Sequence, residues 1–439
     1  MKEKLSLSQI VSLSLMLFAL FFGAGNMIFP PALGQASGEN VWPALAGFIV
    51  TDAGISVLGI AAIVLAGKSL ADLSQKVGPR FAAAFAIMVY FLIGPLFAIP
   101  RTGSVSLELA LLPFLNEGSS VQPYMAIFTF IFFAVTLVLS LNPNKIVDIV
   151  GKILTPVLLI AIAVIGIGVF LHPLGPLGEA TGDYVTMPFF RGLIEGYLAL
   201  DGLAALVFAL IVIENVQAVG VKSKGGIIKY SLLAGALAAI GLAVVYGVLA
   251  YIGATSGTLG QFANGGQLLA AVTRHLYGNG GGIVLGVAVI FACLTTSIGL
   301  TTSFGNYFHE TYPKWSYRTI IILVCGFSFI IANIGLTQLI SITLPVLIMV
   351  YPVTMVLVVC SFFDRFFHGE PAVYICSMIC AFAVSVVDGL KAGGVQLGVV
   401  LEWANMVPFF KLGIGWLVPA IVGALIGFVI GRIRHRRKI

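Results

Sequence analysis

The sequence predicts an all-α integral membrane protein with twelve transmembrane helices. Of its 439 residues 59% are hydrophobic and only 9% are charged, with a mean hydropathy of +1.10, whereas soluble domains are about 45 to 50% apolar and about 25% charged. The apolar runs are continuous and reach the length of about 20 residues that a bilayer-spanning helix needs. Because hydrophobic and polar residues do not alternate within them, a β-barrel is excluded.

Twelve apolar runs qualify as membrane spans. The first could pass for a signal peptide, but its removal would leave eleven spans, so we interpret it as a span. The runs cover residues 8–36, 41–66, 81–113, 122–140, 147–171, 187–217, 227–252, 280–308, 317–334, 336–362, 370–389 and 413–433.

Basic residues orient these spans. If the N-terminus is cytoplasmic, only Arg274, Lys391 and Lys411 fall on the opposite side, and Arg101 and Arg191 lie in or beside spans. The cytoplasmic side then receives eighteen of the 23 Lys and Arg residues, namely Lys2, Lys4, Lys68, Lys76, Arg80, Lys145, Lys152, Lys222, Lys224, Lys229, Lys314, Arg318, Arg365, Arg432, Arg434, Arg436, Arg437 and Lys438. This bias predicts that both termini are cytoplasmic. The net charge of +6 reflects topology, so we expect membrane lipid as a partner and no nucleic acid.

The first span contains a cluster of helix-breaking residues. Gly23-Ala24-Gly25-Asn26 is followed by Met, Ile and Phe and then by Pro30-Pro31. Backbone polar groups in hydrocarbon must be paired, so such a break is tolerated only where it lines a cavity or binds a ligand. The two glycines permit unwinding and the prolines suit the start of a second half-helix. The alternative is a simple proline kink.

The sixth span has a similar interruption, with Gly192, Glu195, Gly196, Asp201 and Gly202 near its middle. Interruptions in corresponding spans of two halves are typical of inverted-repeat transporters, whose site lies between discontinuous helices. The two breaks lie five spans apart, an odd number, so the halves must insert in opposite orientations. Free N–H groups at a half-helix start suit a carboxylate, and free carbonyl groups suit an ammonium group or a cation. A zwitterionic amino acid meets both demands.

The eighth span carries six hydroxyl residues, Thr295, Thr296, Ser297, Thr301, Thr302 and Ser303, in an otherwise apolar helix. Their density favours a site for a hard cation, which prefers oxygen ligands. The alternative is that the hydroxyl groups bond back to their own helix and assist packing.

Four ionisable residues, Asp52, Arg101, Glu108 and Asp201, fall within spans, where charge is costly and indicates function. Helical spacing predicts that Arg101 lies in the outer half of the third span. It could gate the cavity or bind a carboxylate; otherwise it pairs with Glu108 or Asp201 or extends towards the membrane surface.

Two further segments have predicted roles. The stretch from Gly266 to Tyr277, before the eighth span, suits a short surface helix that could act as a lid. Gly423, Gly427 and Gly431 form a tandem GxxxG face in the last span, which we interpret as packing within the chain and not as a dimer seam.

Taken together, three stretches resemble the bacterial branched-chain amino acid:cation symporter family. They are the Gly-Ala-Gly-Asn-Met-Ile-Phe-Pro-Pro run from Gly23, the Gly-Pro-Leu-Phe-Ala-Ile-Pro-Arg-Thr run that ends at Thr102, and the region of Asp201. The likeness covers nearly the whole chain. It implies the leucine-transporter-like fold of the amino acid/polyamine/organocation superfamily, with one inverted five-helix repeat in 6–171, a second in 187–362 and two extra helices in 370–433.

The resemblance also implies site residues. It implies that the backbone amides of Gly23, Ala24 and Gly25 receive the substrate carboxylate. From their positions in the broken spans and the third span, we also expect Asn26, Arg101, Leu200, Asp201 and Gly202 to contact substrate. Ala292, Thr295 and Thr296 look like the superfamily's sodium pattern, completed by carbonyl groups of Ala19 and Phe22. A register one residue later, at Thr296 and Ser297, fits as well. Aspartate at 201 departs from the wider superfamily, which leaves its role open.

The sequence therefore predicts a secondary transporter, not an enzyme, that imports leucine, isoleucine or valine with sodium by alternating access. It would lie in a bacterial cytoplasmic membrane as a monomer or weak homodimer, with Na+ as coupling ion and no other cofactor. A proton-coupled symporter of other neutral amino acids is the main alternative, with Asp201 as the candidate proton carrier. A channel is a weaker one, because the polar groups converge on one place and do not form a continuous path.

Overall fold

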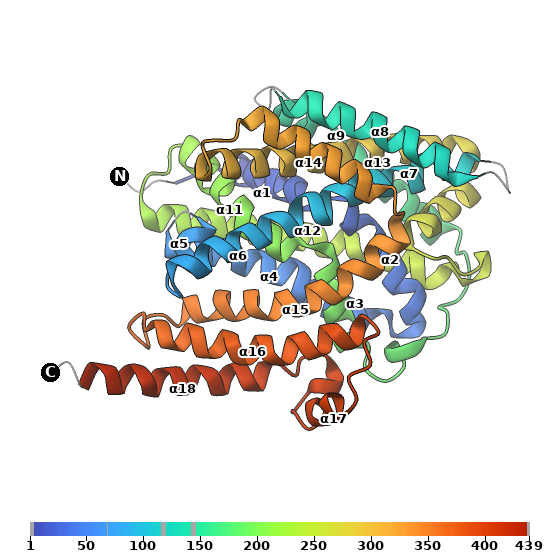
Figure 1. Ribbon diagram of the computed structural model, residues 1–439. Helices are drawn as coiled ribbons and strands as arrows, with labels where there is room; N and C mark the ends of the chain where they lie inside the picture. The colour runs from blue at the N-terminus through green and yellow to red at the C-terminus, as the bar shows by residue number, and fades with distance from the viewer. Residues whose placement is uncertain (1–3, 68, 116–119, 142–145, 437–439) are drawn as a thin grey trace.

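The computed structural model describes residues 4–67, 69–115, 120–141 and 146–436, and these residues form a bundle of helices (Figure 1). The predicted positions of Lys2, Lys68, Lys145, Arg437 and Lys438 lie outside the described residues. The helices are α1 Leu7–Phe21, α2 Ala24–Ser37, α3 Val41–Ile49, α4 Ile55–Ala66, α5 Leu70–Ser74, α6 Pro79–Phe91, α7 Ala98–Ala110, α8 Val121–Ser140, α9 Ile146–Leu171, α10 Pro188–Glu195, α11 Asp201–Ala218, α12 Lys224–Thr255, α13 Gly265–Thr311, α14 Tyr317–Ala332, α15 Leu336–Phe362, α16 Pro371–Ala392, α17 Val399–Asn405 and α18 Leu417–Arg436.

Each predicted span coincides with one of these helices or with a group of them. Within the described ranges, nine helical segments are long and apolar enough to cross a membrane, and three apolar helices are shorter. The first span appears as the short α1 followed by α2, which runs on through the second span as one helical segment, Ala24–Ala66. Twelve crossings, the repeat boundaries and the inverted symmetry remain predictions.

The first and sixth spans are interrupted where the glycine clusters lie. In the first, α1 ends at Phe21 and α2 begins at Ala24, with extended backbone at Gly23. In the sixth, α10 is followed by one tight turn, η7 (Gly196–Ala199), and α11 begins at Asp201. Leu200 between them has a left-handed backbone with φ of 73°, which is unfavourable for a residue with a side chain and occurs mainly where the surroundings impose it.

The third span is also interrupted, so the ideal helical spacing used to place Arg101 does not apply. A wide π-helical turn, η3 (Leu92–Leu96), contains non-helical backbone at Gly94, and α7 starts only at Ala98. Pro95 cannot continue the hydrogen-bond ladder, which explains the interruption. Arg101 therefore lies in the first turn of a new helix segment, and its position cannot be derived from an ideal helical rise.

Glycines bring α2 into backbone contact with two neighbouring helices. A Cβ atom added to Gly34 would lie 2.0 Å from the carbonyl oxygen of Ala250 in α12, and one added to Gly253 would lie 2.0 Å from that of Pro31. A Cβ atom on Gly265 at the start of α13 would lie 1.8 Å from the carbonyl oxygen of Ile28. Because no side chain fits at these crossings, α2 packs on α12 and α13 at the closest distance that helices allow.

The segment expected to form a surface helix is the first part of α13, which bends at Gly278 before the eighth span begins. It packs more deeply than a surface helix would, since Leu268, Leu269 and Val272 are buried. A role as a lid remains a prediction.

The last two long helices, α16 and α18, lie side by side at one edge of the bundle (Figure 1). A Cβ atom on Gly423 would lie 2.5 Å from the carbonyl oxygen of Cys376, and one on Gly427 would lie 2.3 Å from that of Ala372. Gly431 faces Glu370 in the same way. The tandem GxxxG face is thus used for packing within the chain, as predicted.

The start of α1 and the end of α18 lie towards the same side of the bundle (Figure 1). A salt bridge between Lys76, before α6, and Asp364, after α15, joins two loops that the charge pattern assigns to the same side of the membrane. The outer surface carries exposed apolar side chains such as Phe130, Val138 and Ile240. Such a surface suits lipid tails and would be unfavourable in water.

Candidate functional site

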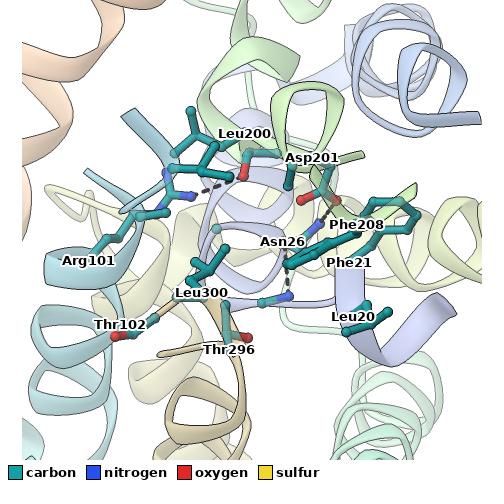
Figure 2. A pocket seen from close by; sticks show the side chains of 17 residues that line it. Leu20, Phe21, Asn26, Arg101, Thr102, Leu200, Asp201, Phe208, Thr296 and Leu300 are labelled. Carbon is teal, nitrogen blue, oxygen red and sulfur yellow. Dashed lines mark hydrogen bonds between the residues drawn. The ribbon is translucent and has the colours of Figure 1, made fainter. Parts of the chain in front are cut away.

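Residues of both helix breaks line one small cavity (Figure 2). Its volume is about 30 Å³, enough for water molecules but far too small for an amino acid. The lining residues come from the first, third, sixth and eighth predicted spans: Leu20, Phe21, Gly23, Ala24, Gly25, Asn26, Ile93, Ala98, Arg101, Thr102, Ala199, Leu200, Asp201, Ala204, Phe208, Thr296 and Leu300.

The start of α2 presents backbone amides to this cavity. The N–H group of Gly23 donates to the side-chain oxygen of Asn26 at 3.0 Å. The N–H groups in the first turn of any helix have no partner within the helix, and they carry the positive end of its dipole. Gly25 brings this turn close to Arg101, since an added Cβ atom would lie 2.8 Å from Nη2. Backbone donors and a guanidinium group therefore meet at one wall.

The side chain of Arg101 reaches from the third predicted span to the sixth. Its Nη1 donates to the carbonyl oxygen of Leu198, and its Nη2 donates to that of Ala199 at 3.0 Å. The guanidinium carbon lies 5.1 Å from the ring centre of Phe29, a cation–π contact. The side chain is 5% exposed, so the alternative in which it extends to the membrane surface was wrong. Its Nε has no hydrogen-bond partner.

A chain of hydrogen bonds leads from the cavity into the protein interior. Asn26 Nδ2 donates at 2.5 Å both to Asp201 Oδ2 and to the hydroxyl oxygen of Tyr246. The Tyr246 hydroxyl donates in turn to Asp52 Oδ2 at 2.5 Å. The chain thus joins α2, α11, α12 and the π-helical turn η2 (Val50–Gly54) that holds Asp52.

Sequence reasoning missed part of this chain. Asp52 was suspected only as a charge within a span, and Tyr246 gave no signal, because one tyrosine in a long apolar run has no distinguishing pattern. A π-helical turn is often found at functional sites, but it cannot be recognised from the residues of η2.

Of the cation ligands predicted on α13, Thr296 lies beside the broken first span. Thr295 and Thr296 hydroxyls both donate to the carbonyl oxygen of Ala292, at 2.7 and 3.2 Å. A Cβ atom on Gly23 would lie 3.2 Å from Thr296 Oγ1, so this hydroxyl adjoins the break. Ala19 and Phe22 lie at the end of α1. Ser297, the alternative ligand, accepts a hydrogen bond from Thr136 in α8 instead. The hydroxyl oxygens of Thr295 and Thr296 and the carbonyl oxygen of Ala292 are grouped on α13, and they are oxygen ligands of the kind that a hard cation prefers.

Two predicted or suspected residues lie apart from the cavity. Gly202 does not line it and packs against Tyr351 and Ile55. Glu108 accepts a hydrogen bond from Asn264 at 3.3 Å, before α13. Of the substrate residues predicted, the cavity therefore brings together Gly23, Ala24, Gly25, Asn26, Arg101, Leu200 and Asp201.

Comparison with known protein families shows to which family this chain belongs. The model of the branched-chain amino acid transport protein family matches residues 6–434. The chain belongs to this family. Its transporter relatives include the branched-chain amino acid permease BraB of Bacillus subtilis, 46% identical over 98% of this chain and 97% of that protein. The branched-chain amino acid permease BrnQ of Escherichia coli is 35% identical over 100% and 99% of the two chains. The family consists of permeases and not of enzymes.

Solved structures show the fold of the transporter. The nucleobase-cation-symport-1 family transporter Mhp1, in a closed conformation with bromovinylhydantoin bound, aligns with a TM-score of 0.65 over 96% of this chain and 92% of its own. MhsT in complex with L-phenylalanine aligns with a TM-score of 0.58 over 94% and 98%. Both are 15% identical to this transporter, so the likeness concerns the fold alone.

Proposed function

We propose that this transporter imports leucine, isoleucine and valine by sodium-coupled symport with alternating access. The observation that supports it best is the cavity between the two helix breaks. One wall offers hydrogen-bond donors suited to a carboxylate, and the remaining walls are largely apolar. The names of the relatives specify branched-chain amino acids.

The substrate carboxylate would bind at the start of α2. Free N–H groups of Ala24, Gly25 and Asn26 provide donors there, and Arg101, whose buried Nε has no hydrogen-bond partner, also lines the cavity. A hydrogen bond to a charged group contributes about 1.5 to 3 kcal/mol. The carboxylate oxygen atoms of Asp201 and the carbonyl groups of the broken sixth span are suited to the ammonium group.

The branched side chain would bind among Leu20, Phe21, Ile93, Phe208 and Leu300, which line the cavity. Buried aliphatic groups contribute about 0.8 kcal/mol per methylene, which favours leucine, isoleucine and valine over small or polar amino acids. Because the cavity is smaller than any of these substrates, the apolar walls must separate on binding. This need for movement fits alternating access better than an open channel.

Sodium would be held by Thr295, Thr296, the carbonyl group of Ala292 and the carbonyl groups of Ala19 and Phe22. Neutral hydroxyl and carbonyl oxygens are ligands that a hard cation accepts without a titratable group. A proton is the alternative coupling ion, and the buried Asp52 and Asp201 are the observation that favours it. We further propose a bacterial cytoplasmic membrane location with both termini inside, and a monomer or weak homodimer.

The test is uptake of labelled leucine into proteoliposomes that carry either a sodium gradient or a pH gradient. Saturable uptake with sodium alone, inhibited by isoleucine and valine, would support the proposal. Uptake driven by a pH gradient with sodium absent would replace sodium by a proton. Uptake that does not saturate would favour a channel.

A further inference from the structure

Two aspartates from different helices share one buried place in the transporter. Asp52 is 0% exposed and Asp201 is 5% exposed. They stand at the two ends of one buried chain of hydrogen bonds, in which Asn26 donates to Asp201 and to Tyr246, and Tyr246 donates to Asp52.

The count of hydrogen-bond donors points the same way. Both hydrogens of the Asn26 amide and the one hydrogen of the Tyr246 hydroxyl are already donated within the chain. Asp52 Oδ1 is buried and receives none of them. A fully charged Asp52 would therefore hold an unsolvated oxygen beside a second anion, and burying a charge without compensation is strongly unfavourable.

The charges near the two aspartates are balanced when one proton is added. The titratable and charged groups that face the pair are Tyr246 on α12, Arg101 on α7 and Tyr351 on α15. Both Nη groups of Arg101 donate to carbonyl oxygens of the sixth span. One guanidinium and two carboxylates carry a net negative charge, and a single added proton makes the group neutral. A zwitterionic substrate does not change this balance.

We propose that Asp52 and Asp201 hold one proton between them, and that this proton keeps α11 of the broken sixth span joined to η2 beside the substrate cavity. Loss of the proton would leave both carboxylates charged in one buried chain of hydrogen bonds and separate α11 from η2. A metal ion fits less well, because Asp52 and Tyr246 do not line the cavity and a cation needs several oxygens around an open space. The inference rests on the proposed function only where leucine serves as the probe.

The first test detects the proton itself. Infrared spectroscopy of the purified full-length protein should show the carbonyl stretch of a buried protonated carboxyl group, lost in both Asp52→Asn and Asp201→Asn. Loss in both variants is the signature of a shared proton. Persistence of the band in both, or its absence from the wild-type protein, would overturn the proposal.

The second test measures leucine binding across pH at saturating sodium. Wild-type binding should weaken by about tenfold per pH unit once the proton is lost at alkaline pH. Asp52→Asn should bind with little pH dependence, because its amide supplies the missing donor permanently; Asp388→Asn on α16 is the matched control and should follow the wild type.

Equal pH dependence in wild type and Asp52→Asn would refute the proposal. If Asp52→Asn does not fold, the infrared band of Asp201→Asn decides, because that readout does not depend on leucine binding. Wild-type protein that binds no leucine at any pH would contradict the proposed function instead, while the infrared band would still report on the pair.

Discussion

At the scale of single residues, the cavity depends on groups that have very little space around them. Gly25 leaves just enough room for the guanidinium group of Arg101, and Gly23 leaves room for Thr296. Arg101 contributes its two outer nitrogens to the sixth span and keeps Nε unpartnered. Substitutions of these residues should displace the groups around the cavity and reduce transport, with a smaller effect on the stability of the bundle.

We expect Gly25→Val to reduce leucine uptake at least about tenfold, equivalent to about 1.4 kcal/mol. The new side chain would collide with Arg101 and cover the amides at the start of α2. Radiolabelled uptake, normalised to protein in the membrane, is the measurement. Gly326→Val on α14, where nothing lies near an added Cβ atom, is the matched control. Wild-type leucine binding by Gly25→Val would refute the proposed carboxylate site.

Arg101→Lys should also impair uptake, by about tenfold or more, because an ammonium group cannot hold two carbonyl groups and offer a third donor as a planar guanidinium does. Initial rates over a range of leucine concentrations are the readout. The same exchange at Arg274, which is exposed and donates to the carbonyl group of Pro113, should leave the kinetics unchanged. Unchanged kinetics in Arg101→Lys would restrict this residue to a structural role.

At the scale of elements, the candidate site is built from helix interruptions more than from regular helices. The half-helices α1 and α2, the turn η7 before α11, and the π-helical turns η2 and η3 bring backbone groups and charged side chains to one place. The hydroxyl groups of α13 lie beside the first of these breaks. Elsewhere, close glycine contacts set how near two helices lie.

Thr296→Ala should raise the sodium concentration needed for half-maximal leucine uptake severalfold, because it removes one oxygen next to the broken first span. The control is Thr343→Ala on α15, which also removes a buried hydroxyl that bonds back to its own helix, here at 2.6 Å from Leu339. A sodium requirement equal in wild type and Thr296→Ala would contradict the assignment of this hydroxyl.

Gly427→Leu should destabilise the contact of α18 with α16 by about 1 to 3 kcal/mol, the usual cost of overpacking. The carbonyl group of Ala372 occupies the space that the new side chain needs. Thermal unfolding in detergent measures the effect, with Gly326→Leu as the substitution into open space. A melting temperature unchanged in Gly427→Leu would mean that the two helices do not pack so closely.

At the scale of the whole molecule, the charge pattern and the fold agree on which loops share a side. The ion pair of Lys76 with Asp364 and the position of both termini fit one assignment of sides. Orientation in the membrane follows from the positive-inside bias alone.

Single cysteines at positions 2 and 437 should therefore react with a membrane-impermeant maleimide only after the membrane is opened. A cysteine at position 391, assigned to the opposite side, is the control and should react in intact cells. Labelling of position 2 or 437 in intact cells would reverse or break the predicted topology.

Much of this architecture could be predicted because its signals are local. Glycine and proline clusters mark the breaks of the first and sixth spans, and hydropathy marks the helices. The carbonyl partners of Arg101 and the link from Asp201 to Asp52 could not be predicted, because they depend on how helices distant in sequence pack. The interruption of the third span was missed although Gly94 and Pro95 were visible, since a single such pair also occurs in simple kinks.

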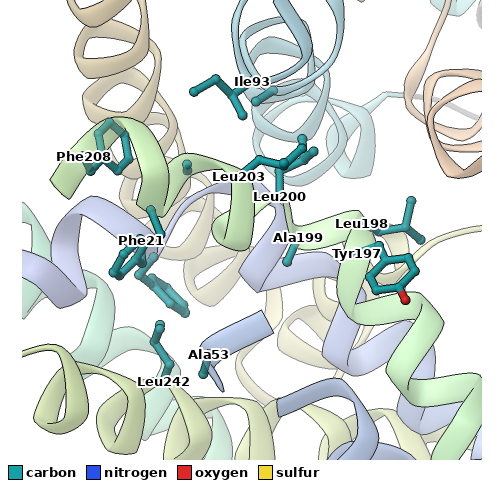
Figure 3. Packing of buried hydrophobic residues seen from close by; sticks show 14 of the residues in the cluster. Phe21, Ala53, Ile93, Tyr197, Leu198, Ala199, Leu200, Leu203, Phe208 and Leu242 are labelled. Atoms are coloured by element: carbon teal, nitrogen blue, oxygen red, sulfur yellow. The ribbon is translucent and has the colours of Figure 1, made fainter. Parts of the chain in front are cut away.

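Buried hydrophobic side chains pack densely around these breaks (Figure 3). The two halves of the first span, α1 and α2, differ in how they contact their neighbours. Gly34, Gly253 and Gly265 fasten α2 to α12 and α13 backbone against backbone. Sliding α2 past either neighbour would force main-chain atoms together, so these three segments must travel as one rigid body. The non-helical residues Phe22 and Gly23 between α1 and α2 are then the natural hinge. Alternating access in this protein would therefore move α1 against a fixed outer half, and the two pieces of one membrane span would belong to different moving parts.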